Sequence, residues 1–327
     1  MKRLTALASV GVIAVVGLVA GTGPAQAKVP GPNGQIVFVR TDFSTGKQNI
    51  YFVNPDGSHL RKLVFPWDVD VPHWSPSGSR IAFVTSLNRC PPTCLGHAHT
   101  VILNPDTGHY RILQAADPNL FTSCTVWSPD ASHFACDGEN DNNQSVNGLY
   151  TIRSSDGLGL KRITNAHGLA DIPIDYSPDG SQIVFGRVDP FGHACTKSSA
   201  IFVVNVDGTG LHRITPWGFC DDDGNWSPDG KEIAFVHQTG RSPGSIFVVH
   251  PDGSGLAKIP LATNSWSSAG DVCWSPDGKK MVFILADPTS FGIATANAEG
   301  TDVQEVTSAP NGWLDHEADW GPHPLAT

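Results

Sequence analysis

Residues 226–235 read Trp-Ser-Pro-Asp-Gly-Lys-Glu-Ile-Ala-Phe, and this stretch decides the fold because it recurs along the chain. An aromatic residue followed by Ser-Pro occurs at Trp74, Trp127, Tyr176, Trp226 and Trp274, and a shortened copy, Trp320-Gly321-Pro322, follows near the end. Neighbouring copies are 46 to 53 residues apart. A regular period of this length predicts a series of equivalent structural units.

Each repeat has the pattern of four strands. The Pro sets φ at the first corner of a turn and the Gly accepts the backbone at its exit, so the alternating run at residues 233–235 folds back onto the aromatic strand. A second hairpin is predicted where a run such as residues 246–249 leads into Asp-Gly. A short segment containing basic residues, such as 256–259, is typical of an exposed edge strand. Four strands per repeat indicate the blades of a β-propeller.

The two ends of the repeat region complete each other. The first unit begins at residues 34–38 without an aromatic strand of its own, whereas residues 319–322 supply such a strand with nothing after it. We therefore expect the N- and C-terminal segments to pair within one blade and to close the ring. The predicted fold is all-β, a six-bladed propeller of four-stranded blades.

The first 27 residues have the order of a secretion signal. Lys2 and Arg3 precede an apolar run at residues 4–20, and the small triplet at residues 25–27 matches a cleavage site. We expect a signal peptide at residues 1–27 and a propeller domain at 28–327, secreted or periplasmic. The alternative is an uncleaved membrane anchor, because the run lies at the short end of the lengths that span a bilayer. After cleavage we expect no stable membrane insertion.

The motifs resemble the WD40-like (PD40-type) repeat of TolB-like propellers over about residues 34–322. The resemblance implies a six-bladed propeller that serves as a protein-binding platform or, when fused to other domains, as a gate on a peptidase. TolB itself carries an α/β domain before its propeller. Here only a few residues separate the expected cleavage site from the first blade.

Charge and composition narrow the partners. The chain has 31 acidic and 21 basic residues and a formal net charge of −10, which argues against nucleic acid. It contains no phosphate-cradling loop, and the repeats take up nearly all of the chain after residue 27. We therefore predict a monomeric, non-enzymatic platform that binds a protein or an extracellular small-molecule or glycan ligand. The alternative is a carboxylate- or metal-dependent hydrolase or lyase that acts on a carbohydrate or lactone.

Cysteine pairing is expected because all seven cysteines lie in the exported part. Cys124 and Cys136 flank a predicted turn almost symmetrically, which favours a cross-strand disulfide. The other candidates are two cysteines within one loop and two on loops of the fourth blade that open on the same face: Cys90, Cys94, Cys195 and Cys220. Cys273 then remains as a buried thiol.

A ligand site is expected on the face formed by the long loops, where the chain enters each aromatic strand and joins the second strand to the third. We call this the long-loop face. Acidic residues recur near the start of the aromatic strands and would form a ring at a channel mouth that concentrates cations or basic peptide groups. The alternative is that they are solvated or cap their own turns. The predicted ligand-binding residues are Asp70, Asp171, Asp221, Asp222, Asp271, Asp315, His316 and Glu317.

Metal binding has a weaker sequence signal. Residues 137–141 and 221–225 space oxygen ligands as Ca²⁺ requires, but neither completes an EF-hand. The loop histidines, at positions 97, 99, 193 and 316, could join the carboxylates around another divalent cation, although scattered surface histidines are the simpler interpretation. Convergence of several such side chains within ligand distance would favour catalysis, and a splayed ring would favour binding.

Overall fold

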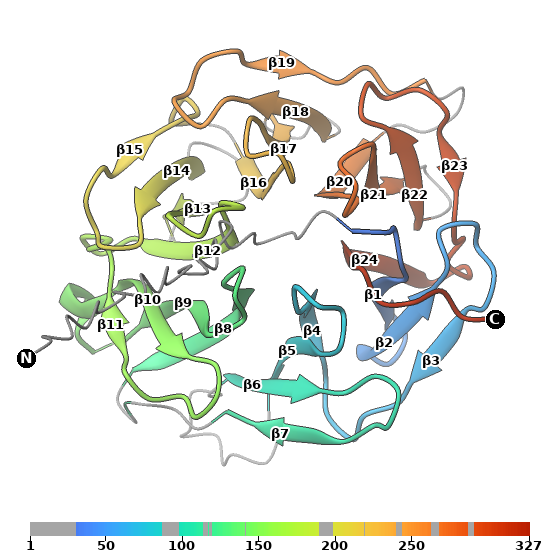
Figure 1. Ribbon diagram of the computed structural model, residues 1–327, viewed down its shortest axis with the longest axis horizontal. Coiled ribbons are helices and arrows are strands. Elements are labelled where there is room, and N and C mark those ends of the chain that lie inside the picture. The colour runs from blue at the N-terminus through green and yellow to red at the C-terminus, as the bar shows by residue number, and fades with distance from the viewer. Residues whose placement is uncertain are drawn as a thin grey trace, which may run out of the picture.

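The computed structural model describes residues 31–86, 98–113, 117, 120–140, 142–189, 199–218, 220–239, 244–262, 268–286 and 291–327. Within them, six four-stranded antiparallel sheets are arranged radially around a centre, which confirms the predicted six-bladed propeller (Figure 1). One 3₁₀ turn, η1 (Gln144–Val146), lies between β9 and β10. No helix among the described residues has the length and apolar character needed to cross a membrane.

Each blade runs from an inner strand to a short outer strand, and we name it by its inner strand. The first three blades are β24 (Trp313–Trp320), β1 (Ile36–Asp42), β2 (Lys47–Val53), β3 (Arg61–Leu63); β4 (Asp70–Trp74), β5 (Ile81–Ser86), β6 (Ala98–Leu103), β7 (Tyr110–Ile112); and β8 (Phe121–Trp127), β9 (His133–Glu139), β10 (Gly148–Arg153), β11 (Lys161–Arg162). The other three are β12 (Ala170–Tyr176), β13 (Gln182–Val188), β14 (Ser199–Asn205), β15 (His212–Arg213); β16 (Cys220–Trp226), β17 (Ile233–Gln238), β18 (Ser245–Val249), β19 (Ala257–Lys258); and β20 (Ser268–Trp274), β21 (Lys280–Ala286), β22 (Phe291–Asn297), β23 (Gln304–Glu305).

The ring is closed by strands from the two ends of the described chain, as expected. β24 pairs with β1, and Trp320 lies opposite Ile36 in the register. Gly34 N–H donates to the carbonyl oxygen of Gly321 at 3.0 Å, and the indole N–H of Trp320 donates to the carbonyl oxygen of Gly34 at 2.9 Å. The aromatic strand that the first repeat lacks is therefore supplied by the last.

The core consists of apolar side chains packed between neighbouring blades. One phenylalanine from the second strand of every blade is fully buried: Phe38, Phe83, Phe134, Phe185, Phe235 and Phe283. Around Phe38 the cluster joins two blades, because it also contains Val282 of β21 and Trp320 of β24. Each buried side chain of this size stabilises the fold by about 1.5–3 kcal/mol.

The S-P-D-G turns owe their recurrence to a local hydrogen-bond pattern. The hydroxyl of Ser227 donates to Asp229 at 2.8 Å, and Ser227 N–H donates to the carbonyl of Glu232. Gly230 has φ of +73°, a conformation that favours glycine. These contacts hold β16 against β17. They lie within the turn itself, so the recurrence of the motif is explained without a bound ligand.

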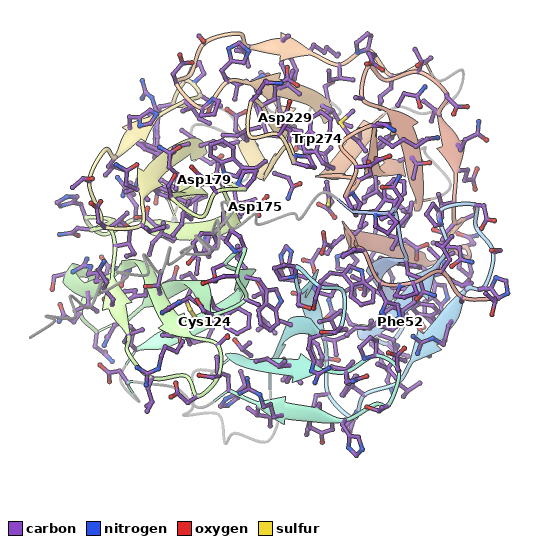
Figure 2. All side chains as sticks on the ribbon, in the orientation of Figure 1. Phe52, Cys124, Asp175, Asp179, Asp229 and Trp274 are labelled. Carbon is purple, nitrogen blue, oxygen red and sulfur yellow. A yellow bond between two sulfur atoms is a disulfide. The ribbon has the colours of Figure 1, made fainter. Side chains whose placement is uncertain are left out.

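The cysteines follow the prediction where the structure describes them. A disulfide joins Cys124 of β8 to Cys136 of β9 with a Cα–Cα distance of 4.2 Å (Figure 2). Cys273 is a buried thiol whose S–H donates to Asp319 at 3.1 Å. Cys220 is disulfide-bonded. The remaining candidates, Cys90, Cys94 and Cys195, lie outside the described residues.

Candidate functional site

A cavity of about 300 Å³ occupies the centre of the ring. Its lining comes chiefly from five of the six inner strands, β4, β12, β16, β20 and β24, which begin at the long-loop face. Its apolar wall includes Ile172, Pro173 and Val188, and its acidic lining residues are Asp221, Asp271, Glu317 and Asp319. The channel is therefore a mainly apolar pocket with several acidic residues in its lining.

Three of the predicted carboxylates are engaged within the propeller. Asp315 forms a two-point ion pair with Arg40, with Nη2 at 2.6 Å from Oδ2, and accepts from the hydroxyl of Thr307 at 2.6 Å. Asp171 is held in the same way by Arg187, at 2.6 and 2.7 Å, and by the hydroxyl of Thr164.

The third of these carboxylates, Asp221, contacts His237 Nδ1 at 2.6 Å. Like Asp171 and Asp315, it is almost completely buried. All three side chains therefore join the first strand of a blade to the second.

The partners of these three carboxylates were missed by sequence reasoning, although a signal exists. Arg40, Arg187 and His237 each follow the recurring phenylalanine of the second strand by two residues. The strand register places each of them directly opposite its aspartate. A basic residue at this position in a repeat predicts that the acid opposite is an ion-pair partner.

A second set of polar side chains ties neighbouring blades together. Asp175 accepts from the backbone N–H of Trp226 at 3.0 Å, and Asn225 accepts from that of Trp274 at 3.1 Å. Asp319 accepts from the backbone N–H of Trp74 at 2.7 Å. Each of these residues directly precedes the aromatic residue that ends its inner strand, and Figure 2 shows Asp175 beside the centre of the ring. Their side-chain oxygens serve contacts between blades.

In the β8 blade the acid lies on the second strand instead. Asp137 of β9 is partly buried, and its Oδ1 accepts from Ser123 N–H at 2.9 Å. Burial first, and then repulsion from Glu139, raise the pKa of Asp137 to about 7. The adjacent Asn140 side chain accepts from the backbone N–H groups of Asn142 and Asn143. The candidate Ca²⁺ segment is thus partly used in its own turn, and residue 141 lies outside the described residues.

The raised pKa of Asp137 predicts a pH-dependent stability. Its pKa is higher in the folded protein than in the unfolded chain, so its contribution to stability is greatest below about pH 4 and is lost as pH rises to about 7. Asp137→Asn should therefore raise the melting temperature relative to wild type more at pH 8 than at pH 5, by an amount equivalent to about 1–2 kcal/mol. Glu299→Gln, which removes an exposed charge, is the control. Equal shifts at both pH values would contradict the prediction.

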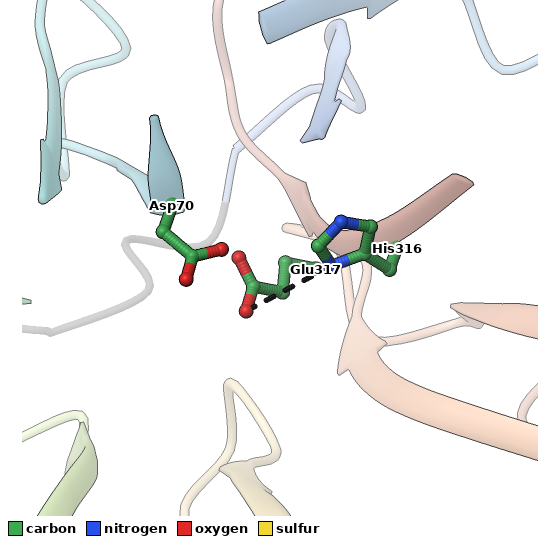
Figure 3. A group of neighbouring side chains, drawn as sticks. All are labelled: Asp70, His316 and Glu317. Atoms are coloured by element: carbon green, nitrogen blue, oxygen red, sulfur yellow. Dashed lines mark ion pairs between the residues drawn. The ribbon is translucent and has the colours of Figure 1, made fainter. Parts of the chain in front are cut away.

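Four of the predicted residues gather at one side of the channel mouth. Asp70 begins β4, Asp271 lies in β20, and His316 and Glu317 lie in β24. One ligand atom each from Asp70, His316 and Glu317 lies within 4.8 Å of the others (Figure 3). The carboxyl groups of Asp70 and Glu317 face each other within hydrogen-bonding reach. Nothing is described for the side chain of Asp222.

Backbone strain is concentrated at this cluster. Val71, Asp271 and Glu317 have φ of 49°, 44° and 54°, values that non-glycine residues rarely adopt. The strained units are linked in sequence around the channel, because Glu317 N–H donates to Asp271 Oδ2 at 2.6 Å and Val71 N–H donates to Glu317 Oε2 at 2.5 Å. Such strain persists where surrounding contacts enforce it and clusters at functional sites.

The electrostatics of the cluster follow from its burial. Burial first, together with the contact to Asp70, holds the pKa of Glu317 well above its usual range. Burial also lowers the pKa of His316, against the opposing effect of Asp271 and Asp70. The histidine ring is therefore favoured in its neutral form beside a carboxyl pair that resists full ionisation.

Comparison with known proteins identifies the fold. No family model matches the chain. TolB from Acinetobacter baumannii superposes with a TM-score of 0.68 and 20% identity, covering 88% of this chain and 66% of that one. A putative TolB from Agrobacterium tumefaciens gives 0.62 and 17%, covering 89% and 100%. In fold, the chain is a TolB-like six-bladed β-propeller.

Three further proteins are similar to this propeller. Uncharacterized protein Atu1656 of Agrobacterium fabrum is 33% identical over 136 residues, and the match spans 42% of each chain. A chain of a nidogen/laminin complex has a TM-score of 0.63 at 9% identity, covering 89% of this chain and 99% of that one. An oligogalacturonate lyase in complex with manganese has a TM-score of 0.50 at 17% identity, covering 86% and 75%.

Proposed function

We propose that this propeller is an exported, non-enzymatic platform that binds a protein partner by receiving a short apolar segment of it in the central channel from the long-loop face. The observation that carries the proposal is the cavity of about 300 Å³ with its apolar wall of Ile172, Pro173, Ile174 and Val188. A pocket of this kind suits an anchor side chain, which supplies most of the energy of a typical protein interface.

Two further features support the long-loop face as the binding surface. Ile172 is 45% exposed although it lines the channel, which leaves apolar surface for a partner to cover. Phe43 and Trp217 are exposed in segments of the long-loop face, between β1 and β2 and between β15 and β16. Export rests on the expected signal at residues 1–27, and a protein partner is consistent with the nidogen/laminin neighbour.

The test places a photo-crosslinking amino acid at position 172, identifies the protein captured, and titrates that purified partner against variants. Ile172→Arg should weaken binding at least about tenfold, because it places a charge in an apolar pocket. Leu211→Arg is the matched control, since Leu211 is 43% exposed but lies beyond the hairpin that follows β14, on the opposite face. Equal capture at positions 172 and 211, with binding unchanged in Ile172→Arg, would reject the proposal.

The second candidate is a carboxylate- or metal-dependent hydrolase or lyase acting on a carbohydrate or lactone. It is favoured by the convergence of Asp70, His316 and Glu317 within ligand distance and has a precedent in the similarity to a manganese-bound oligogalacturonate lyase. Turnover of oligogalacturonate or of simple lactones in the presence of Mn²⁺ would favour this enzymatic function over the binding platform, provided that Glu317→Gln abolishes the turnover. A binding platform gives no turnover of either substrate.

A further inference from the structure

Asp70 and Glu317 present oxygen atoms that the protein itself does not neutralise. Asp70 Oδ1 is buried and accepts no hydrogen bond from any described donor. The carboxyl group of Glu317 faces Asp70, and among the described N–H groups it accepts only from that of Val71, at Oε2. Within the described part of the chain, no Lys or Arg forms an ion pair with either residue. Two opposed carboxyl groups in this position require a shared proton or a cation.

The contrast with the other aspartates of the inner strands is informative. Asp171 and Asp315 each face an arginine on the next strand, and Asp221 faces His237, so each of these three acids has a side-chain partner within its own blade. The Asp70–Glu317 pair joins two different blades across the channel mouth and has no such partner among the described residues. The pair is therefore satisfied either by a shared proton or by a cation that enters from the channel.

His316 adds a nitrogen donor that is already oriented. Its Nε2 lies 2.8 Å from the hydroxyl of Thr41, and its Nδ1 faces Glu317 Oε1 at 3.9 Å (Figure 3). If Nε2 carries the proton and donates to Thr41, the lone pair of Nδ1 points into the cluster. A ring nitrogen fixed by a hydrogen bond to its other nitrogen is the usual arrangement of a metal-binding histidine.

We infer that Asp70, His316 and Glu317 bind one divalent transition-metal ion of the Zn²⁺ or Mn²⁺ class at the channel mouth. The ligand atoms, all within 4.8 Å of one another, need only a small inward movement to reach the bond lengths of about 2.0–2.2 Å that these metals require. The imidazole excludes Ca²⁺ as the preferred ion, because Ca²⁺ takes six to eight oxygen ligands.

Three protein ligands leave positions open toward the channel. The inference deepens the proposed function, since such an ion would lie at the entrance used by the partner and could bind an acidic or carbonyl group of the inserted segment. Glu317 N–H donates to Asp271, and the Glu317 carboxyl group accepts from Val71 N–H. These two contacts fix the strained backbone of Glu317 and preorganise its carboxyl group for this role.

Direct metal titration of the EDTA-treated protein tests the inference. We expect one Zn²⁺ or Mn²⁺ per chain by calorimetry, and d–d absorption with Co²⁺ that indicates nitrogen and oxygen ligands. Asp70→Asn and His316→Gln should each weaken binding by more than about 100-fold, and Thr41→Val, which removes only the hydrogen bond that orients the ring, by about 10- to 100-fold. His250→Gln and Glu299→Gln are exposed controls with wild-type affinity.

A second measurement separates metal binding from folding. Without metal, Asp70→Asn should raise the melting temperature, because it removes one of two opposed carboxylates, and the same variant should show no rise on addition of Zn²⁺ or Mn²⁺. No binding at millimolar metal, unchanged affinity in the ligand variants, or binding of Ca²⁺ alone would each overturn the inference. Titration of the partner against EDTA-treated wild type tests the proposed function separately from the metal site. If the partner still binds, the protein is a binding platform that does not need the metal.

Discussion

Arg40→Ala should lower the free energy of unfolding by about 3–5 kcal/mol, because it leaves the buried carboxylate of Asp315 without its partner. The Arg40 side chain is 8% exposed and that of Asp315 is 0% exposed. Their two-point contact joins β1 to β24, the strands that close the ring. The lost contact therefore weakens the β24–β1 pairing, which closes the ring of blades.

The matched control for this variant is Arg153→Ala. Arg153 also makes a two-point contact with an aspartate, Asp156, at 3.1 and 2.9 Å, but its side chain is 46% exposed. An ion pair this exposed contributes little to stability, because solvent screens the two charges. Urea unfolding of both variants, followed by tryptophan fluorescence, measures the two effects. Similar losses in the two proteins would show that burial of Arg40 and Asp315 is not what makes the pair important.

Trp320→Ala should destabilise the protein by about 3–5 kcal/mol, as expected for loss of a large buried aromatic side chain. Trp320 is 1% exposed and packs against Ile36, Phe38 and Val282, which belong to two blades. The variant also loses the indole hydrogen bond to the carbonyl of Gly34. Packing within the closing blade and packing against its neighbour are lost together.

Trp217→Ala provides the comparison, because Trp217 is 37% exposed in the segment before β16. We expect it to change the free energy of unfolding by about 0.5 kcal/mol or less. Thermal and urea unfolding of the two tryptophan variants give the readout. If Trp320→Ala were as stable as Trp217→Ala, the contacts of Trp320 at the β24–β1 closure would not be important for the stability of the propeller.

The candidate site could be predicted only in part. The sequence placed acidic residues at the starts of the inner strands, and Asp70, His316 and Glu317 do meet there. It did not separate them from Asp171, Asp221 and Asp315, since all look alike as acids preceding an aromatic strand. The difference lies in which side chain stands opposite in the strand register. Asp171 faces Arg187 within its own blade, whereas Asp70 faces Glu317 of another blade.

The apolar channel wall was not predicted, for a similar reason. Ile172, Pro173 and Val188 belong to strands whose alternation indicates only that one face is buried. Whether that face packs on a neighbouring blade or lines a central cavity depends on the tilt and number of the blades. The backbone strain at Val71 and Glu317 was not predicted either, because both residues lie at register shifts between paired strands, and local sequence favours no left-handed conformation at either one.

Period, turn chemistry and alternation determined the number of blades, their four strands, the closure by residues 319–322 and the Cys124–Cys136 disulfide, because all of these depend on contacts between neighbours in the repeat. Tertiary structure alone decided which carboxylates meet across blades at the channel mouth. Those contacts join residues up to 246 positions apart, and their geometry is set by the packing of complete blades around the ring.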